Sequence, residues 1–135
     1  MIALKRIYRR LTGVKRDTVK VVIEWEGKVL LVRPTYGHKL WTLPGGGRNR
    51  GEGLAETATR ETREEVAMEL ESLAFCGTFD QPKTNRVSVF KARSLSGAFI
   101  VDEIEITEAR WFDPRHVPDG HGPRLLKCLA LAGYR

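Results

Sequence analysis

The segment LPGGGRNRGEGLAETATRETREEV, residues 43–66, constrains the fold more than any other part of the sequence. Five glycines fall within its first eleven residues, and the part from Leu54 to about Met68 has a helical composition with Glu52 near its start. Glycine lets the backbone approach another group closely, whereas a helix holds its side chains at fixed spacing. The segment therefore predicts a flexible loop that leads directly into an acidic helix.

Three carboxylates share one side of this helix. Glu64 and Glu65 follow Glu61 by three and four residues, the spacing of neighbours on a helical face. Their mutual repulsion costs about 0.2–0.5 kcal/mol per pair, and a hard divalent cation such as Mg²⁺ would offset it. The same residues could instead form a solvated face, because Glu56–Arg60 and Arg60–Glu64 are i,i+4 pairs of opposite charge.

The helix also carries a stripe of small or apolar residues. Ala55, Thr59, Thr62 and Val66 follow one another at helical spacing. We expect this stripe to face a β-sheet.

Length and composition indicate one globular domain. A chain of 135 residues can bury a sizeable core. No apolar run reaches the length that crosses a bilayer, and the N-terminus is too charged for the apolar part of a signal peptide. Cys76 and Cys128 lack CxxC spacing, so we expect a reduced, cytoplasmic protein in which both thiols act as small hydrophobes.

The positive charge is concentrated at the N-terminus. The chain has a net charge of +6, and residues 1–20 account for all of it, with seven bases against Asp17. We treat residues 1–17 as a basic arm, either part of the same domain or a flexible extension, and residues 18–135 as the folded domain. The arm either packs on the domain as an amphipathic turn or attracts polyanions.

The rest of the chain alternates strands and helices, which predicts an α/β fold. TVKVVIEWEGKVLLVR (residues 18–33) reads as a hairpin around Glu26-Gly27, and LWTL (residues 40–43) as a short extended piece. Further strands are expected at residues 70–79, 86–92 and 105–112, with a turn, QPKTN, at residues 81–85. A closing helix is expected at residues 123–132.

The loop and helix together resemble the Nudix box, G-x5-E-x7-R-E-U-x-E-E-x-G-U, in which U is a bulky aliphatic residue. Gly46, Glu52, Arg60-Glu61 and Glu64-Glu65 stand at its spacing, and the match runs from Gly46 to Met68. WTLPGG before it and EARWFDP (residues 108–114) are also similar to segments of that family.

Two positions depart from the box. Thr62 stands at an aliphatic position, and we expect its hydroxyl to need a hydrogen-bond partner. Ala67 replaces the late glycine, so we expect the helix to end without a positive φ.

The resemblance implies a Nudix-type α/β/α sandwich with a mixed β-sheet. It implies a hydrolase that uses Mg²⁺ or Mn²⁺ to cleave the diphosphate linkage of a nucleoside diphosphate linked to another group X. Carried over, the metal ligands are Glu61, Glu64, Glu65 and the backbone carbonyl of Gly45. Gly46 and Gly47 would let the backbone approach metal and substrate phosphate.

The resemblance also suggests catalytic roles. Arg60 would orient the carboxylates with Glu52 as its ion-pair partner, and Glu61 is our choice of general base. The segment DEIEITE offers four acids as extra ligands or bases: Asp102, Glu103, Glu105 and Glu108. We expect all but one of these four to lie on a solvated strand edge.

Substrate contacts are less constrained by the sequence. Arg33 could meet a phosphate, and Trp41 or Tyr36 could stack on a base, although Trp41 also suits the core. Pro82, 15 residues after Ala67, is similar to a mark of family members that cleave ADP-ribose.

We expect a small nucleotide as the partner, no membrane, and leave a homodimer open. Two alternatives also stay open. One is a hydrolase of RNA 5′ ends whose basic arm follows the phosphates, and the other is a non-catalytic Nudix-fold module that binds nucleotides.

Overall fold

A mixed β-sheet forms the centre of the computed structural model, which describes residues 17–81 and 86–134. Its strands run in the order β4-β5-β1-β2-β6, and β3 pairs separately with β1. The β1–β5 pair is parallel, whereas the other pairs are antiparallel. The strands are β1 (Thr18–Trp25), β2 (Lys28–Pro34), β3 (Gly45–Gly47), β4 (Glu71–Asp80), β5 (Arg86–Arg93) and β6 (Ile106–Phe112).

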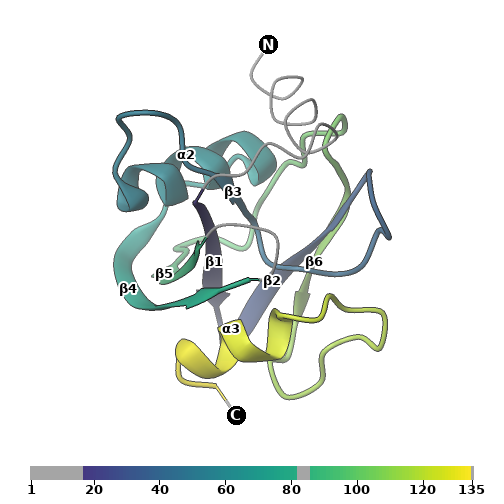
Figure 1. Cartoon of the computed structure of the whole chain (residues 1–135). Coiled ribbons are helices and arrows are strands. Elements are labelled where there is room, and N and C mark those ends of the chain that lie inside the picture. Colours follow the sequence, from purple (N-terminus) through teal and green to yellow (C-terminus); the bar gives the residue numbers. More distant parts are fainter. Residues whose placement is uncertain (1–16, 82–85, 135) are drawn as a thin grey trace.

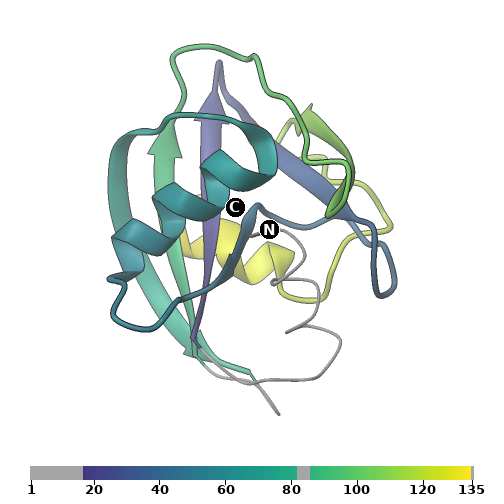
Figure 2. The same cartoon turned by 90° about the horizontal axis from the view of Figure 1, so that it is seen from above.

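One helix covers each face of this sheet, as Figures 1 and 2 show. Helix α2 (Leu54–Val66) packs over one set of buried residues, including Val21 and Val32, and helix α3 (Leu125–Leu131) packs over another, including Val22 and Val89. Alternate residues of the same strands serve the two layers. The expected α/β/α sandwich with a mixed sheet is therefore confirmed.

The structure leaves two of the expected features untested. The basic arm, apart from Asp17, and four residues of the QPKTN turn, including Pro82, lie outside the described residues. Among the described residues no helix is long and apolar enough to cross a membrane.

A split between β1 and β2 positions the glycine-rich segment. The two strands pair next to their turn, at Glu24–Val29 and Trp25–Lys28. Farther along, the segment from Trp41 to Gly47 bonds to both strands. Thr42 exchanges two backbone hydrogen bonds with Val32 of β2, at 2.8 and 2.9 Å. The amide of Val21 in β1 donates to the Pro44 carbonyl at 2.8 Å. Three glycines have little strand propensity, so β3 was not expected from the sequence.

Helix α2 buries a different face from the one that we expected. Ala55 is exposed and Thr59 only half-buried, so the predicted stripe was wrong at these two positions. The buried residues are Thr57, Ala58, Glu61, Thr62, Glu65 and Val66. The expectation failed because it placed only small and apolar residues against the sheet, whereas Glu61 and Glu65 are also buried.

The C-terminus of α2 corrects a second expectation. Ala67 follows the helix in the left-handed conformation, with φ 55° and ψ 40°, and its amide donates to the Arg63 carbonyl at 3.1 Å. The chain must reverse here to reach β4, and the left-handed residue closes the helix as glycine usually does.

The buried Thr62 hydroxyl has no hydrogen-bond partner among the described residues.

Candidate metal and catalytic site

The glycine strand β3 lies directly against the carboxylates of α2. The Gly45 amide donates a hydrogen bond of 3.1 Å to Oε1 of Glu65. A Cβ on Gly46 would lie 2.4 Å from the carboxyl carbon of Glu61, which no real contact allows. The absent side chain at Gly46 therefore leaves the space that the Glu61 carboxylate occupies.

Burial distinguishes the three predicted metal ligands. Glu61 is 0% exposed and Glu65 is 3% exposed, while the Glu64 side chain is 17% exposed. Burial of carboxylates is costly unless opposite charge or hydrogen bonds compensate. The site must therefore supply positive charge close to Glu61 and Glu65.

Arg60 supplies that charge to Glu61 and also contacts Glu64, while the Gly45 amide hydrogen bonds Glu65. The five N–H groups of Arg60 all donate. Nε donates to Glu52 at 2.6 Å. Nη2 donates both to Glu52 and to the Gly47 carbonyl, each at 2.9 Å. Nη1 donates to Glu61 at 2.9 Å and to Glu64 at 3.1 Å. One guanidinium thus joins the loop, the strand β3 and two of the helix carboxylates.

Glu52 fixes Arg60 from the loop side. Its Oε1 also accepts hydrogen bonds from the Asn49 amide at 3.0 Å and the Thr57 hydroxyl at 2.8 Å. The hydrogen bonds from Arg60, more than any other cause, lower the pKa of Glu52 to about 2, although burial opposes the shift. The pKa of Arg60 rises through the same hydrogen bonds. This pair is therefore charged at any physiological pH.

A loop from the far end of the chain closes over the C-terminus of α2. The Ile100 amide donates to the Val66 carbonyl at 3.0 Å, and the Asp102 amide to the Glu65 carbonyl at 2.9 Å. Within the same segment Glu105 is 0% exposed, whereas Glu103 is exposed. Glu105 is thus the one acid of the four that the structure removes from solvent.

Two of the predicted substrate residues, Arg33 and Trp41, form a second group on the α3 side of the sheet, whereas Gly46 and Gly47 lie in β3. Trp41 packs against the core beneath α3, with its ring edge-on to Phe112 at 5.0 Å. The Arg33 and Arg110 guanidinium groups lie 5.6 and 6.0 Å from the Trp41 ring centre. Arg33 also pairs with Glu108 at 2.7 Å. Arg33 and Trp41 therefore lie together, apart from the carboxylates of α2.

Sequence reasoning missed one cation beside the glycine strand. Lys20 pairs in register with Gly45, and its ammonium group lies 3.3 Å from both the Thr42 hydroxyl and the Leu43 carbonyl. The available signal was position alone. Lys20 is the single charged residue in the otherwise apolar run of β1 from Val19 to Ile23.

The donor set suits a divalent cation. Carboxylate and carbonyl oxygens are the ligands that Mg²⁺ and Mn²⁺ prefer, and Gly46 makes room for one of these carboxylates. As the side chains stand, no group of three or more His, Cys, Asp or Glu within residues 17–81 and 86–134 already surrounds a common point. Arg60 and the Gly45 amide hold the carboxylate oxygens for which an ion would compete.

Comparisons with known proteins agree with the motif. A family model described as the NUDIX domain matches residues 14–131. A NAD-capped RNA hydrolase, NudC, from Pseudomonas aeruginosa is 30% identical over 100 residues, which is 73% of this chain and 36% of that protein. A putative 8-oxo-dGTP diphosphatase from Bacillus subtilis is 29% identical over 99 residues, covering 73% of this chain and 66% of that protein. The chain thus spans little more than a third of the length of its NudC relatives.

The fold comparison points the same way. The crystal structure of a MutT NUDIX hydrolase from Burkholderia pseudomallei superposes with a TM-score of 0.78 at 22% identity, over 87% of this chain and 97% of that one. Because the family model covers most of the chain and the box residues assemble around Arg60, the chain belongs to the Nudix hydrolase family.

Proposed function

We propose that this chain hydrolyses the diphosphate linkage of a nucleoside diphosphate derivative at the site built by β3 and α2. The observation that carries the proposal is the arrangement of Arg60. One guanidinium holds Glu61 and Glu64 beside a glycine strand whose amide holds Glu65. A solvated helical face would not need two inward-facing glutamates.

We propose Glu61, Glu64, Glu65 and the Gly45 carbonyl as the groups that hold Mg²⁺ or Mn²⁺. When bound, such an ion neutralises phosphate oxygens and lowers the pKa of a water molecule. Nudix hydrolases generally use divalent metals, and the hard oxygen donors of this site support Mg²⁺ or Mn²⁺ here. Glu61 would accept the proton of the attacking water, and Arg60 would position its carboxylate.

Four further residues extend the proposal to the substrate and to the proton transfer. Lys20 would contact a substrate phosphate, because its ammonium group lies beside the Leu43 carbonyl, two residues before Gly45. Arg33 and Trp41 would contact the nucleoside, since Trp41 leads into the same segment. Glu105 is the additional carboxylate that we add to the site, because it is buried in the loop bonded to the end of α2.

A substrate panel tests the proposal. The full chain would be incubated with and without Mg²⁺ on nucleotide sugars, ADP-ribose, dinucleoside polyphosphates, oxidised dNTPs and NAD, and products would be separated by anion-exchange chromatography. We expect Mg²⁺-dependent cleavage between two phosphorus atoms of at least one compound. Absence of turnover on every compound, in a folded protein with Mg²⁺ or Mn²⁺, would instead support a binding module.

A second candidate is hydrolysis at the 5′ end of RNA. It is favoured by the NudC relative, a NAD-capped RNA hydrolase by name, and by the charge excess in residues 1–20. Basic segments follow phosphates with a strong dependence on salt. If RNA is the substrate, NAD-capped RNA is cleaved with a higher kcat/KM than free NAD at low salt, and deletion of residues 1–12 removes that difference. Equal kcat/KM values would favour the small molecule.

A further inference from the structure

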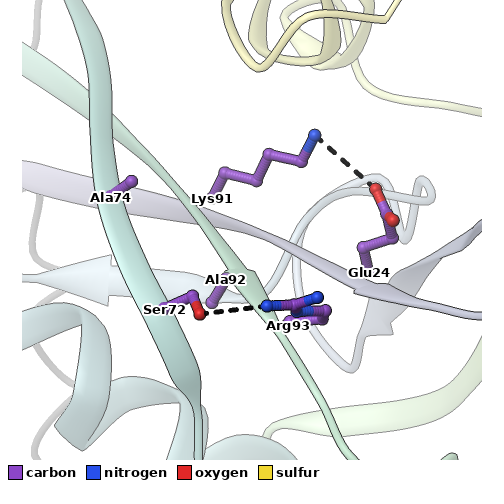
Figure 3. Close-up of a pocket in the computed structure, with 6 residues that line it drawn as sticks. All are labelled: Glu24, Ser72, Ala74, Lys91, Ala92 and Arg93. Carbon is purple, nitrogen blue, oxygen red and sulfur yellow. Dashed lines mark hydrogen bonds and ion pairs between the residues drawn. The ribbon is translucent and has the colours of Figure 1, made fainter.

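A pocket lies at the opposite end of the sheet from β3. It is a hollow of about 270 Å³ lined by residues of β1, β4 and β5: Glu24, Ser72, Ala74, Lys91, Ala92 and Arg93 (Figure 3). Glu24 stands four residues beyond Lys20, the partner of Gly45 in β1, which is roughly 13 Å along a strand. The pocket is therefore separate from the carboxylate site.

The pocket begins where helix α3 stops covering the sheet. On this face β1 presents Val22 and then Glu24, while β5 presents Val89 and then Lys91 and Arg93. The Val22 and Val89 side chains pack beneath α3, which has only seven residues. The next positions along both strands are charged, so the uncovered end of the sheet forms a polar hollow.

Lys91 and Glu24 form one fixed wall of the hollow. The Lys91 ammonium lies 3.5 Å from Glu24 and 4.6 Å from the ring centre of Tyr134. The Tyr134 hydroxyl donates to the same Glu24 carboxylate, and burial raises the pKa of Tyr134. The carboxylate is therefore committed to two partners, and Lys91 is held in place from two sides.

Arg93 is the cation of this pocket that forms no ion pair among the described residues. Glu24 and Glu71 are its cross-strand neighbours, yet among the described residues no carboxylate lies within 4 Å of its guanidinium. Its contact across the hollow is to the neutral Ser72 hydroxyl, at 3.4 Å, as Figure 3 shows. Arg93 is exposed, so its remaining donors are open to solvent beside the hollow, with no charged acceptor among the described residues.

Ser72, the residue that makes this contact, has an unfavourable backbone conformation. Its φ is +56°, a region that residues other than glycine seldom adopt. It belongs to a β-bulge, since the register of β4 against β5 shifts between Glu71 and Ala74. A bulge redirects a side chain relative to a regular strand, and here it brings the hydroxyl beside Arg93.

We propose that this pocket binds a phosphomonoester. Arg93 would bind two phosphate oxygens with its planar guanidinium and Ser72 would donate its hydroxyl, while Lys91, paired with Glu24, offsets the negative charge of that carboxylate. The shared chemistry is a phosphate dianion, whether free or carried by a nucleoside monophosphate, for which Ala74 and Ala92 offer apolar surface. The site does not depend on the hydrolytic function proposed above.

Titration by two-dimensional NMR locates this binding. The full chain, free of divalent metal, would be titrated with inorganic phosphate and, separately, with AMP. We expect saturable shifts of the amides of residues 72–74 and 91–93 with both ligands. Tighter binding of AMP would identify the nucleotide as the preferred source, and equal affinity would identify free phosphate.

Matched variants decide whether the pocket residues cause the binding. Arg93→Gln should weaken binding about tenfold or more, as expected for a lost charge-assisted hydrogen bond. Ser72→Gly should weaken it less while keeping the fold, because glycine accepts the positive φ. Arg115→Gln, which removes an exposed arginine in the loop after β6, should change affinity less than twofold. Unchanged affinity in Arg93→Gln, or shifts confined to residues 45–65, would overturn the proposal.

Discussion

At the scale of single residues, the site depends on the geometry of one guanidinium. Arg60 uses each of its five N–H groups on a different oxygen, from Glu52, Glu61, Glu64 and the Gly47 carbonyl. A lysine ammonium has three donors and no planar fork, so it cannot replace this arrangement. The charge alone is therefore not sufficient.

We predict that Arg60→Lys lowers kcat/KM about 10- to 100-fold, the usual effect of removing a group that orients metal ligands. The measurement is steady-state hydrolysis of the best panel substrate, together with the Mg²⁺ concentration that gives half-maximal rate, which should rise. Arg63→Lys is the control, because exposed Arg63 on the same helix forms an ion pair with exposed Glu69. Wild-type kinetics in Arg60→Lys would show that the fork has no catalytic role.

The pKa of Glu52 gives a prediction about stability and pH. Its folded pKa is lowered from 4.5 to about 2, mainly by Arg60. A lowered folded pKa means that the ionised pair stabilises the fold above pH 4.5, and that this contribution is lost as pH falls towards 2. Glu52→Gln should therefore be less stable than wild type at pH 7, by up to about 3 kcal/mol.

Urea unfolding at pH 7 and at pH 2.5 measures this difference. The gap in unfolding free energy between wild type and Glu52→Gln should narrow at pH 2.5, because the glutamate of the unfolded wild type is then protonated and most of the benefit of the lowered folded pKa is lost. A gap that is the same at both pH values would mean that Glu52 is not held ionised by Arg60.

At the scale of elements, β3 and α2 form one unit in which a strand of glycines meets a helix face of glutamates. Contact this close leaves no volume for a side chain at Gly46. The geometry of the carboxylates is therefore set partly by what the strand lacks.

We predict that Gly46→Ala lowers kcat/KM strongly, by about 100-fold, while the protein still folds, since its Cβ must displace the Glu61 carboxylate by an ångström or more. Gly120→Ala is the steric control, because nothing lies within 4 Å of a Cβ there. Kinetic assays paired with circular dichroism make the comparison. Full activity in Gly46→Ala would show that Glu61 is free to move without loss of function.

The end of α2 yields a stability prediction with the opposite sign. Ala67 has φ 55°, where an L-residue with a Cβ is strained by about 1–2 kcal/mol. Ala67→Gly should relieve this strain and stabilise the protein by about 0.5–1 kcal/mol, after the greater entropy of glycine in the unfolded chain is subtracted. Ala55→Gly, in the same helix at an exposed position, should instead destabilise by up to about 1 kcal/mol. Urea midpoints of the two variants should move in opposite directions, and a destabilised Ala67→Gly would contradict the account.

At the scale of the whole molecule, periodicity predicted the layers but not the contacts between them. The hairpin around Glu26-Gly27, the helix from Leu54 and the later strands follow from local propensity and were confirmed within a few residues. Strand β3 was missed because its three glycines carry no strand signal; pairing with β1 alone makes it a strand.

The site shows the same division between local and tertiary information. The spacing of Glu61, Glu64 and Glu65 was visible in the sequence, but the burial of Glu61 and Glu65 depends on where β3 runs. The left-handed Ala67 and the buried Glu105 could not be predicted, because each depends on a segment distant in sequence or on how the chain leaves the helix.

The central claim is that the carboxylates of α2 hold a catalytic divalent metal. It is tested by measuring Mg²⁺-dependent turnover and Mn²⁺ binding by electron paramagnetic resonance in wild type, Glu64→Gln, Glu65→Gln and the control Glu69→Gln. Glutamine at position 65 can still accept the Gly45 hydrogen bond, so the fold should survive. We predict that Glu64→Gln and Glu65→Gln each lose about 100-fold in kcat/KM at limiting Mg²⁺, equivalent to about 2.7 kcal/mol, and bind Mn²⁺ more weakly, whereas Glu69→Gln matches wild type. Wild-type turnover at limiting Mg²⁺ in either of the first two variants would contradict the claim.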